Sequence, residues 1–254
     1  QKSREVTLQT LQDIQSHHLL AIPFESLDCI VHGKGVDLSP YALEQKLIFG
    51  GRGGYCFEHN ILLFHVLKSL GFDVYTALAR LRWNKPVDIT SGATHLVLVV
   101  KVGSKRYLCD AGWSSFGSFT PLEIETEDEQ VTKFETRRIL KEEEHYLHQM
   151  YSQDKWHDMY VFTLNRAYPM DWLVGSYFMS THPTSFALST AVVITFTEQS
   201  RLTIVNKTFS TRYADGSAES RDISTEEEYY EVLRNVFKLS LPDDFRIVLP
   251  NTVW

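Results

Sequence analysis

The segment HLVLVVKV, from His95 to Val102, constrains the fold more than any other part of the chain. Its side chains are apolar almost throughout, which is typical of a strand that is covered on both faces. The residues VGSK that follow carry a tight-turn signal, so we expect the chain to return as a partner strand over residues 106–110. The sequence therefore predicts an antiparallel hairpin whose first strand is buried on both faces.

The first third of the chain has helical periodicity. Apolar side chains at spacings of three or four predict a helix near residues 8–18, and Ser39 followed by Pro40 is a typical helix start. Residues 56–70 predict a further helix, which is apolar on most sides and therefore buried. Gly71 is expected to end this helix in a left-handed conformation.

Strand-like runs follow the hairpin and precede a closing helix. They lie at residues 160–164, 191–196 and 201–205. The closing helix begins near Thr225, where a glutamate three residues later indicates a capping box. Two acidic runs, residues 123–130 and 141–144, are most simply solvated loop or helix faces. This order of elements predicts an α+β protein of two or three subdomains.

The composition argues against several classes of protein. A net charge of −7 over 254 residues disfavours nucleic-acid binding, which usually needs a basic face. No apolar stretch approaches the roughly 18 residues that span a bilayer, and the opening QKSREVTLQT lacks the apolar core of a signal peptide. Cys29, Cys56 and Cys109 are widely spaced, which favours a reducing compartment and predicts a cytoplasmic protein without a disulfide framework.

The glycine-rich segment FGGRGGYCFEHN, residues 49–60, places Cys56 at the start of the predicted buried helix. The positive end of a helix favours thiolate over thiol, and Gly53 and Gly54 would leave the sulfur reachable. The Lys-Ser/Thr ending of a phosphate-binding loop is missing. A free cysteine is more often a small buried hydrophobe, but the glycine loop and the helix start together favour a reactive thiol.

A nucleophilic thiol needs a base, and the base needs an orienting partner. His59 lies three residues from Cys56 on the same predicted helix, but no acid partner for it is visible in the sequence. His95 lies seven residues before Val102 and Asp110 eight after it, so the two ends of the hairpin come out nearly opposite. This geometry favours a His95–Asp110 pair, although a single histidine is as often a structural hydrogen-bonding residue.

The chain resembles the arylamine N-acetyltransferase family. The RGG-x-C core of RGGYCFEHN, residues 52–60, matches the family's signature around its nucleophile. Other similar segments run in the family's order along nearly the whole chain: AIPFESLD (21–28), LGFDV (70–74), SGATHLVLVV (91–100), LCDAGW (108–113), MSTHPTSF (179–186) and EVLRNVFKLSL near the C-terminus. The resemblance implies a catalytic triad of Cys56, His95 and Asp110, the same residues that the local patterns favour.

The resemblance also implies an architecture of three domains around a triad like that of cysteine proteases. A helical domain over residues 1–72 would carry the nucleophile. A mostly β, barrel-like domain over residues 73–185 would carry the histidine and the aspartate, and an α/β domain over residues 186–254 would form a lid.

Several supporting contacts are implied in the same way. Arg52 is expected to pair with Glu25 and so fix the nucleophile loop, because breaking one half of a buried pair leaves an uncompensated charge. Ser91 and Gly92 match positions that approach coenzyme A. Ser26 stands where the family usually has asparagine, a difference that we expect to matter little.

The implied activity is transfer of an acetyl group from acetyl-CoA, a cosubstrate, to the nitrogen of an arylamine or arylhydrazine in xenobiotic metabolism. It would proceed by a ping-pong mechanism through an acyl-cysteine and without a metal. Neutral arylamines need only aromatic walls, and the candidates are Phe57, Trp113, Phe116, Phe119 and Phe186. Trp113-Ser114 stands where the family often has Phe-Gly, in a loop that lines the acceptor pocket, so the acceptor preference stays open.

Three other functions fit parts of the pattern. The triad would equally serve an acyl-CoA thioesterase or another Cys-His-Asp hydrolase, because water can replace the amine. A non-catalytic binding module would keep the fold with an unreactive Cys56. A metalloprotein is least favoured, because His145 and His148 lie three apart without a cysteine or acidic cluster to complete a site. The sequence leaves open the oligomeric state and the choice among acetyl, propionyl and malonyl donors.

Overall fold

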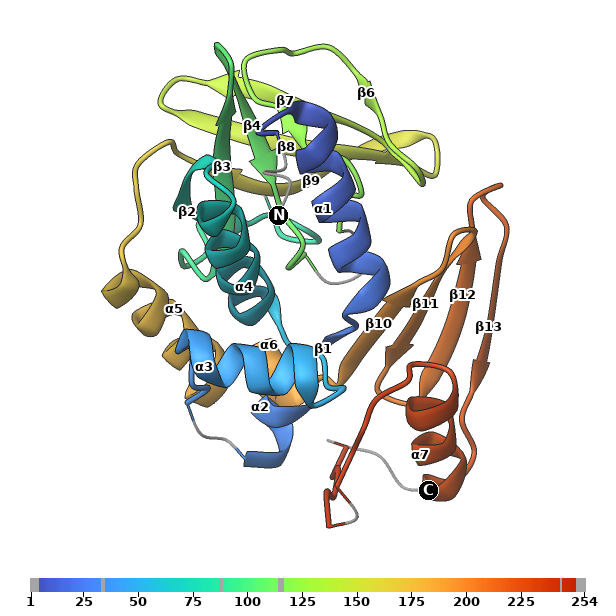
Figure 1. Cartoon of the computed structure of the whole chain (residues 1–254). Helices are drawn as coiled ribbons and strands as arrows, with labels where there is room; N and C mark the ends of the chain where they lie inside the picture. Colours follow the sequence, from blue (N-terminus) through green and yellow to red (C-terminus); the bar gives the residue numbers. More distant parts are fainter. Residues whose placement is uncertain (1–4, 33–34, 87–88, 114–116, 243, 250–254) are drawn as a thin grey trace.

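A computed structural model describes residues 5–32, 35–86, 89–113, 117–242 and 244–249 of the chain. Within them are two antiparallel sheets, a larger one at the top of Figure 1 and a smaller one at the right, and most helices lie below the larger sheet. The larger sheet has eight strands in the order β5-β4-β3-β2-β9-β8-β7-β6. Their bounds are β2 (Asp73–Leu81), β3 (His95–Val102), β4 (Lys105–Cys109), β5 (Leu122–Glu123), β6 (Gln130–Val131), β7 (Thr136–Glu142), β8 (His145–Ser152) and β9 (Lys155–Phe162). Because β5 also lies against β7, the sheet curls into a nearly closed barrel.

The predicted hairpin is present as β3 and β4 and lies inside this sheet. Val102 pairs with Lys105 across the turn, where Gly103 has a φ of 62°. The side chains from His95 to Val100 are all buried, as the unbroken apolar run predicts. β4 ends at Cys109, so Asp110 lies just beyond the ladder. The hairpin thus delivers the ends of both strands to one edge of the barrel.

Five helical segments precede the barrel: α1 (Leu8–Ala21), α2 (Leu27–His32), α3 (Pro40–Leu43), the π-helical turn η1 (Glu44–Phe49) and α4 (Cys56–Ser69). α4 packs against β2 and β3, and it is buried over most of its length as predicted. Gly71 has a φ of +91° after its last turn, and the Phe72 amide donates to the Leu67 carbonyl at 3.1 Å. Only a residue that tolerates positive φ ends a helix in this way, so Gly71 fixes the exit toward β2.

The smaller sheet combines both ends of the chain. It contains β1 (Phe24–Glu25), β10 (Val192–Phe196), β11 (Ser200–Val205), β12 (Thr208–Tyr213) and β13 (Ala218–Asp222), and α7 (Glu226–Asn235) packs on it through a shared apolar cluster. β1 pairs with β10, and Phe24 also forms a bridge with Gly54 in the nucleophile loop. The division at residues 72 and 185 stays a prediction, but the two end segments share this sheet.

Three local predictions were wrong or incomplete. The acidic run 141–144 is exposed as expected, but its first two residues end β7, and Glu143, with a φ of 52°, lies in the turn to β8. The strand predicted at 160–164 is only the end of β9. Thr225 caps α7 as expected, but the second half of the capping box differs. The Glu228 carboxylate accepts from the Ser224 amide instead of from Thr225.

Two helices in the second half of the chain, α5 (Pro169–Thr181) and α6 (Phe186–Ser189), were not predicted. α5 lies at the left of Figure 1 and packs against α2 and α6. Because α5 also has apolar side chains on its exposed face, its sequence lacks the alternation of apolar and polar faces that predicts a helix. No helix among the described residues is both long and apolar enough to cross a membrane.

Candidate active site

His95 and Asp110 are hydrogen bonded inside the barrel edge. The Nε2 atom of His95 lies 2.7 Å from Oδ2 of Asp110, and both side chains are almost fully buried. In the β3–β4 register Cys109 pairs with Leu98, so Asp110 lies opposite Val97, two residues along from His95. His95 and Asp110 are therefore diagonal neighbours on one face of the hairpin. The sequence argument predicted that they meet, and the structure shows this contact.

Asp110 accepts more hydrogen bonds than the sequence indicated. Besides His95, it accepts from the Asn60 amide at 2.9 Å, the Tyr160 hydroxyl at 2.9 Å and the Gly112 backbone N–H at 3.0 Å. Burial alone would raise the pKa of Asp110, but the charge of His95 and the donors around the carboxylate hold it below its usual value. Asp110 is therefore ionised and fixed in orientation.

Sequence reasoning missed Asn60 and Tyr160. Asn60 lies one helical turn after Cys56 and also donates to the Leu96 carbonyl at 2.6 Å, and its oxygen accepts from the Ala111 amide at 3.0 Å. It therefore ties α4 to both strands of the hairpin. The signal was its place in the FEHN motif, four residues after the nucleophile. Tyr160 carries no such local signal, because only the pairing of β9 with β2 brings it to this position.

Cys56 is the first residue of α4 and lies against the loop after Asp110. A Cβ atom on Gly112 would lie 2.6 Å from the Cys56 carbonyl oxygen and 2.7 Å from its Cα, so only glycine lets the two segments pack this closely. The Glu58 carboxylate accepts from the Tyr55 amide at 3.0 Å and caps the helix. The DAG and YCFEH segments are therefore in backbone contact.

The expectation of a ready thiolate at the helix start needs correction. Burial raises the pKa of the Cys56 thiol, the negative charge of Asp110 raises it further, and a hydrogen bond from the Phe57 amide opposes both. Cys56 is only 8% exposed, which explains why the positive helix end does not prevail. Burial and the charge of Asp110 therefore oppose the effect of the helix end, so a base is needed to favour the thiolate.

A buried charge network lies beneath the nucleophile loop. Arg52 donates to Glu25 through Nη2 at 2.6 Å and Nε at 2.9 Å, as expected, and to Asp28 at 2.6 Å. Lys46, which the sequence did not single out, pairs with Asp28 at 2.8 Å and Glu58 at 2.7 Å. The network links α2, η1, the glycine loop and the first turn of α4. Its integrity therefore fixes the position of the nucleophile.

Ser26, beside this network, has a structural role of its own. Its hydroxyl accepts from the Val192 amide at 3.1 Å and donates to the Thr190 carbonyl at 3.3 Å, which holds the start of β10 against the N-terminal segment. The replacement of asparagine therefore keeps a hydrogen-bonding side chain at this position.

His18 and His59 form a second buried pair near the site. Their Nε2 and Nδ1 atoms lie 2.8 Å apart, and Nε2 of His59 contacts the Pro23 carbonyl at 3.1 Å. Nε2 of His59 must donate to that carbonyl, so its Nδ1 accepts from His18. Burial lowers the pKa of His59 to about 4, and burial and His59 together lower that of His18. His59 thus serves the packing of α1 on α4 and has no acid partner among the described residues.

This pair predicts loss of stability in mild acid. A histidine in the unfolded chain has a pKa near 6.5, whereas that of His59 in the folded protein is about 4, so the unfolded state binds protons more readily than the folded one. The free energy of unfolding should therefore fall progressively as the pH is lowered from 6.5 toward 4. We expect the urea midpoint to drop between pH 7.5 and pH 5, and to drop less in His59→Gln. His17→Gln, at an exposed position of α1, should behave as wild type. An unchanged pH slope in His59→Gln would contradict this account.

The aromatic candidates for the acceptor pocket lie in different places. Trp113 packs edge-on against His95, with ring centroids 5.0 Å apart. Phe57 is completely buried against Gly175 and Tyr55, and Phe119 is buried against Phe134 and Phe196. Phe186 is 48% exposed at the start of α6, and Phe116 lies outside the described residues. Of the four described candidates, Trp113 is the one with a ring contact to the His95–Asp110 pair, and Phe57 and Phe119 serve as core.

The structure also gives the positions of Ser91 and Gly92, the proposed contacts with coenzyme A, and of His145 and His148. Ser91 donates to the Leu81 carbonyl at 2.8 Å and Gly92 is exposed, so both lie on the surface segment that leads into His95. His145 and His148 lie three apart on β8 and therefore point to opposite faces. No group of three or more metal-ligating side chains occurs among the described residues.

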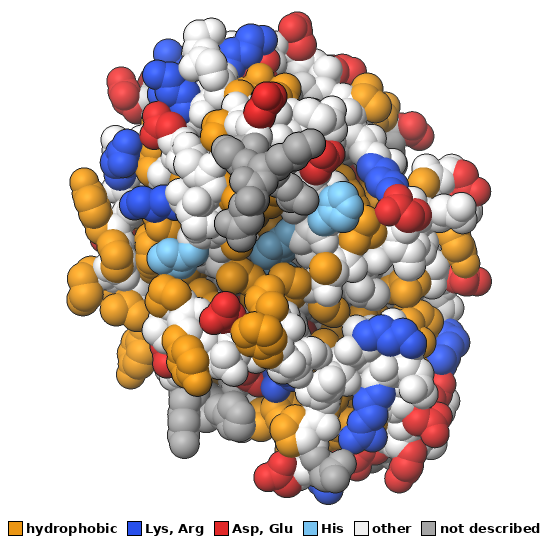
Figure 2. Space-filling view, in the orientation of Figure 1, with side chains coloured by type: hydrophobic (Ala, Val, Ile, Leu, Met, Phe, Trp, Pro, Cys, Tyr) orange, Lys and Arg blue, Asp and Glu red, His pale blue; other side chains and the backbone are white. Residues whose placement is uncertain are grey.

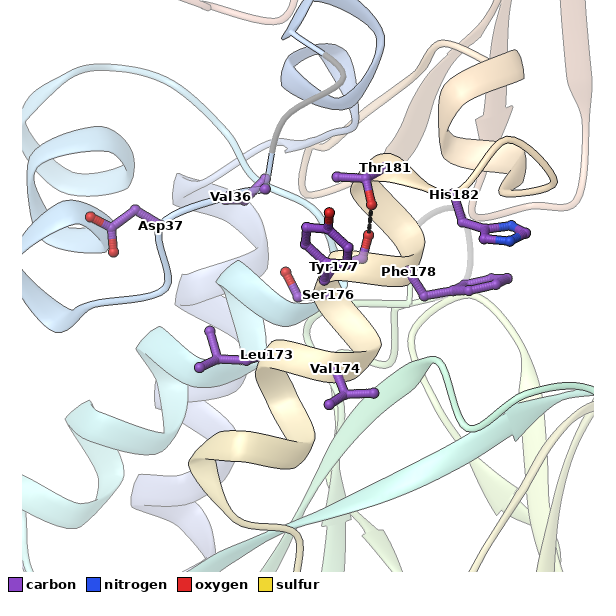
Figure 3. Close-up of a pocket in the computed structure, with 10 residues that line it drawn as sticks. Val36, Asp37, Leu173, Val174, Ser176, Tyr177, Phe178, Thr181 and His182 are labelled. Atoms are coloured by element: carbon purple, nitrogen blue, oxygen red, sulfur yellow. Dashed lines mark hydrogen bonds between the residues drawn. The ribbon is translucent and has the colours of Figure 1, made fainter.

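A groove of about 690 Å³ lies between α5 and residues 35–37, and it was not predicted (Figure 3). Figure 3 shows Leu173 and Tyr177 of α5 facing Val36 and Asp37. The Ser176 hydroxyl, which lines it, is hydrogen bonded to the hydroxyl of Tyr55, next to Cys56. Figure 2 shows hydrophobic side chains gathered over the α5 side of this face. The groove is thus linked through Ser176 and Tyr55 to the start of the nucleophile helix.

A buried cysteine at a helix start, whose backbone packs on the loop that follows a His–Asp pair, fits enzymes that form acyl-cysteine intermediates. A family model described as N-acetyltransferase matches residues 7–246. The chain is 34% identical over 218 residues to an arylamine N-acetyltransferase of Mycobacterium tuberculosis, covering 85% of this chain and 77% of the relative. The chain belongs to the arylamine N-acetyltransferase family.

Solved structures agree with this assignment. The M. smegmatis arylamine N-acetyltransferase superposes with a TM-score of 0.92 at 30% identity, over 98% of this chain and 94% of the other. The Mycobacterium marinum arylamine N-acetyltransferase in complex with CoA superposes with a TM-score of 0.88 at 33% identity, over 92% of this chain and 87% of the other. The α+β fold with a barrel-like sheet, expected from the sequence, is confirmed.

Proposed function

We propose that this chain transfers an acetyl group from acetyl-CoA to the nitrogen of arylamines or arylhydrazines through an acetylated Cys56. The observation that carries the proposal is the buried His95–Asp110 pair on a hairpin whose DAG loop packs directly on the Cys56 backbone. The names of the relatives, and the CoA bound to one of the solved structures, support both substrates.

In the first half-reaction the thiol proton of Cys56 passes to His95, and the sulfur attacks the thioester carbonyl carbon. The C–S bond to coenzyme A breaks, and its thiolate takes the proton from His95. Nε2 of His95 is engaged with Asp110, so Nδ1 is the nitrogen that exchanges this proton. Asp110 stabilises the imidazolium that forms in between. The Phe57 amide, whose hydrogen bond opposes the raised pKa of the Cys56 thiol, is the proposed donor to the developing oxyanion.

In the second half-reaction the amine nitrogen attacks the acetyl carbon of Cys56. The amine proton passes to His95 and then to the departing sulfur, which restores the thiol and releases the N-acetyl product. Arylamines are largely neutral at pH 7, so Trp113 against His95 offers a suitable wall without a charge. Ser91 and Gly92, on the surface segment before His95, are the proposed contacts with coenzyme A.

Release of free coenzyme A from acetyl-CoA distinguishes this function from a thioesterase. We expect release to be strongly stimulated by 4-methoxyaniline and to be lost in Cys56→Ala. Release that ignores the amine would establish hydrolysis instead. Propionyl- and malonyl-CoA in the same assay define the acyl donor. A cytoplasmic location, small-molecule partners alone and independence of metal ions stay predictions.

Gly112→Ala tests the contact between the DAG loop and Cys56. The added methyl group would overlap the Cys56 backbone and push it away from His95. A misplacement of about 1 Å at a reacting centre costs about 10²-fold in kcat/KM. Gly35→Ala is the matched control, because its new Cβ would lie at an ordinary 3.6 Å from Tyr177. Equal amine acetylation by the two variants would show that the loop does not position the nucleophile.

A further inference from the structure

A second buried polar layer lies behind Asp110. Arg137 on β7 and His148 on β8 are 0% and 2% exposed, and Nη1 of Arg137 lies 3.3 Å from Nε2 of His148. The His148 ring packs edge-on against Tyr160 with centroids 4.8 Å apart, and the Tyr160 hydroxyl donates to Asp110. Three successive contacts therefore connect a buried guanidinium with the acid that orients His95.

The donors and acceptors in this layer fix the protonation of His148. A guanidinium can only donate, so Nε2 of His148 must accept from Arg137, and the ring is neutral with its proton on Nδ1. Burial and the charge of Arg137 keep the pKa of His148 well below its usual value. A neutral His148 ring places no charge of its own beside Tyr160, whose hydroxyl donates to Asp110.

The layer is anchored to the smaller sheet. The Glu135 carboxylate accepts from Arg137 at 3.3 Å and from Arg201 of β11 at 2.8 Å, and the three side chains are at most 7% exposed. Burial alone would raise the pKa of Glu135, but the two arginines hold it below its usual value. Because a buried ion needs this compensation, Arg137 is held in one place by both sheets.

We propose that Arg137 and His148 are positioning residues for the catalytic acid, holding the Tyr160 hydroxyl on Asp110 and supplying the buried positive charge behind the Asp110–His95 pair. Arg137, His148, Tyr160 and Asp110 line the same small internal space, which supports one connected unit. The inference rests on the proposed function of Asp110 and His95. It adds two residues, on strands far from the nucleophile loop, to the groups that set the reactivity of Cys56.

The other ionisable groups that face the pair do not supply this charge. Burial raises the pKa values of Tyr160 on β9 and Cys109 on β4, so both stay neutral at physiological pH. Cys56 on α4 is the group whose proton is transferred. Arg137 is therefore the cation of this layer that contacts His148, and its removal should favour the protonated forms of both the thiol and His95.

The test is the pH dependence of Cys56 alkylation by iodoacetamide, measured with the steady-state kcat and KM for acetyl-CoA. In Arg137→Met we expect both limbs of the alkylation profile to move up by about one pH unit, with kcat down about tenfold and KM little changed. Arg137→Lys keeps the charge and should restore most of the profile. Arg138→Gln is the control, because Arg138 lies on the same strand but donates to Gln149 and stacks on Trp156.

A purely structural role makes a different prediction. If Arg137→Met lowers the urea midpoint but leaves the alkylation profile of the folded enzyme in place, the proposal is overturned. Where this variant does not fold, His148→Gln replaces it, because its amide still offers an acceptor to Arg137 but no ring to Tyr160. An unshifted profile and an unchanged kcat in His148→Gln also overturn the proposal. Wild type that alkylates normally but acetylates no amine would refute the proposed function and not this coupling.

Discussion

Asp110→Asn is expected to lower kcat/KM for amine acetylation by about 10³–10⁴-fold. The carboxylate accepts from His95, Asn60, Tyr160 and the Gly112 amide, all of which donate to it. The side-chain amide of asparagine has one acceptor oxygen, and its NH₂ group would face groups that also donate. His95 would no longer be held in the required tautomer, and its charged form would lose its stabilisation. The measurement is kcat/KM for N-acetylation with saturating acetyl-CoA.

Asp158→Asn is the control for this variant. Asp158 also lies in the barrel sheet, on β9, and accepts a side-chain hydrogen bond from Gln149 at 2.7 Å, but it has no contact with His95 in the structure. Its activity should stay within about twofold of wild type, since substitutions away from such features have small effects. Asp110→Asn that retains a tenth or more of the wild-type kcat/KM would show that Asp110 does not orient the base.

Arg52→Met is expected to destabilise the protein by about 3–5 kcal/mol, the range for removing one partner of a buried pair. It leaves the fully buried Glu25 carboxylate with the Leu27 amide, which donates to it at 2.9 Å, but without a cation beside it. Asp28 keeps Lys46, so the loss falls on Glu25 and on the glycine loop before Cys56. The measurement is the free energy of unfolding from urea titration at pH 7.5.

Arg106→Met provides the comparison for Arg52. Arg106 pairs with Glu125 at the surface, where both side chains are more than a third exposed. Exposed pairs contribute about 0–1 kcal/mol, so this variant should unfold near the wild-type midpoint. Similar free energies of unfolding for Arg52→Met and Arg106→Met would mean that the network under the nucleophile loop does not hold it in place.

The parts of the site that could be predicted lie on elements with strong local patterns. The unbroken apolar run of β3 and the turn at Gly103 fix a hairpin, and a hairpin has only one way to bring His95 near Asp110. The glycine loop and the apolar helix place Cys56 at a helix start. Local sequence therefore favoured Cys56, His95 and Asp110, the residues of the proposed triad, and indicated the element on which each lies.

The missed residues depend on contacts that no local pattern reports. Tyr160 reaches Asp110 because β9 pairs with β2, and Arg137 becomes buried because β7 follows β8 across the sheet. In the charged strand TRRILKE an arginine is expected to be exposed, but Arg137 points into the barrel interior and is buried. The sequence argument expected the helix start to lower the pKa of Cys56, but burial raises it. The helix dipole can be inferred from one element, whereas burial depends on the whole fold.

The walls of the acceptor pocket stay a prediction. Phe57 and Phe119 were read as walls because aromatic side chains near a nucleophile suit an arylamine, yet both are buried in the core. Sequence alone does not say which face of α4 meets α5, and Gly175 is the residue that makes room for the Phe57 ring. Trp113 was distinguished by its position directly after the DAG loop, which the hairpin holds beside His95.

The central claim is that Cys56 carries the acetyl group between the two substrates. Enzyme mixed with acetyl-CoA in the absence of amine is quenched in acid, digested and analysed by mass spectrometry of the peptide that contains Cys56. The account predicts one added acetyl group on Cys56, and its disappearance with matching formation of N-acetyl product when 4-methoxyaniline is added. Product formed at the wild-type rate without acetylated Cys56, or by Cys56→Ala, would contradict it.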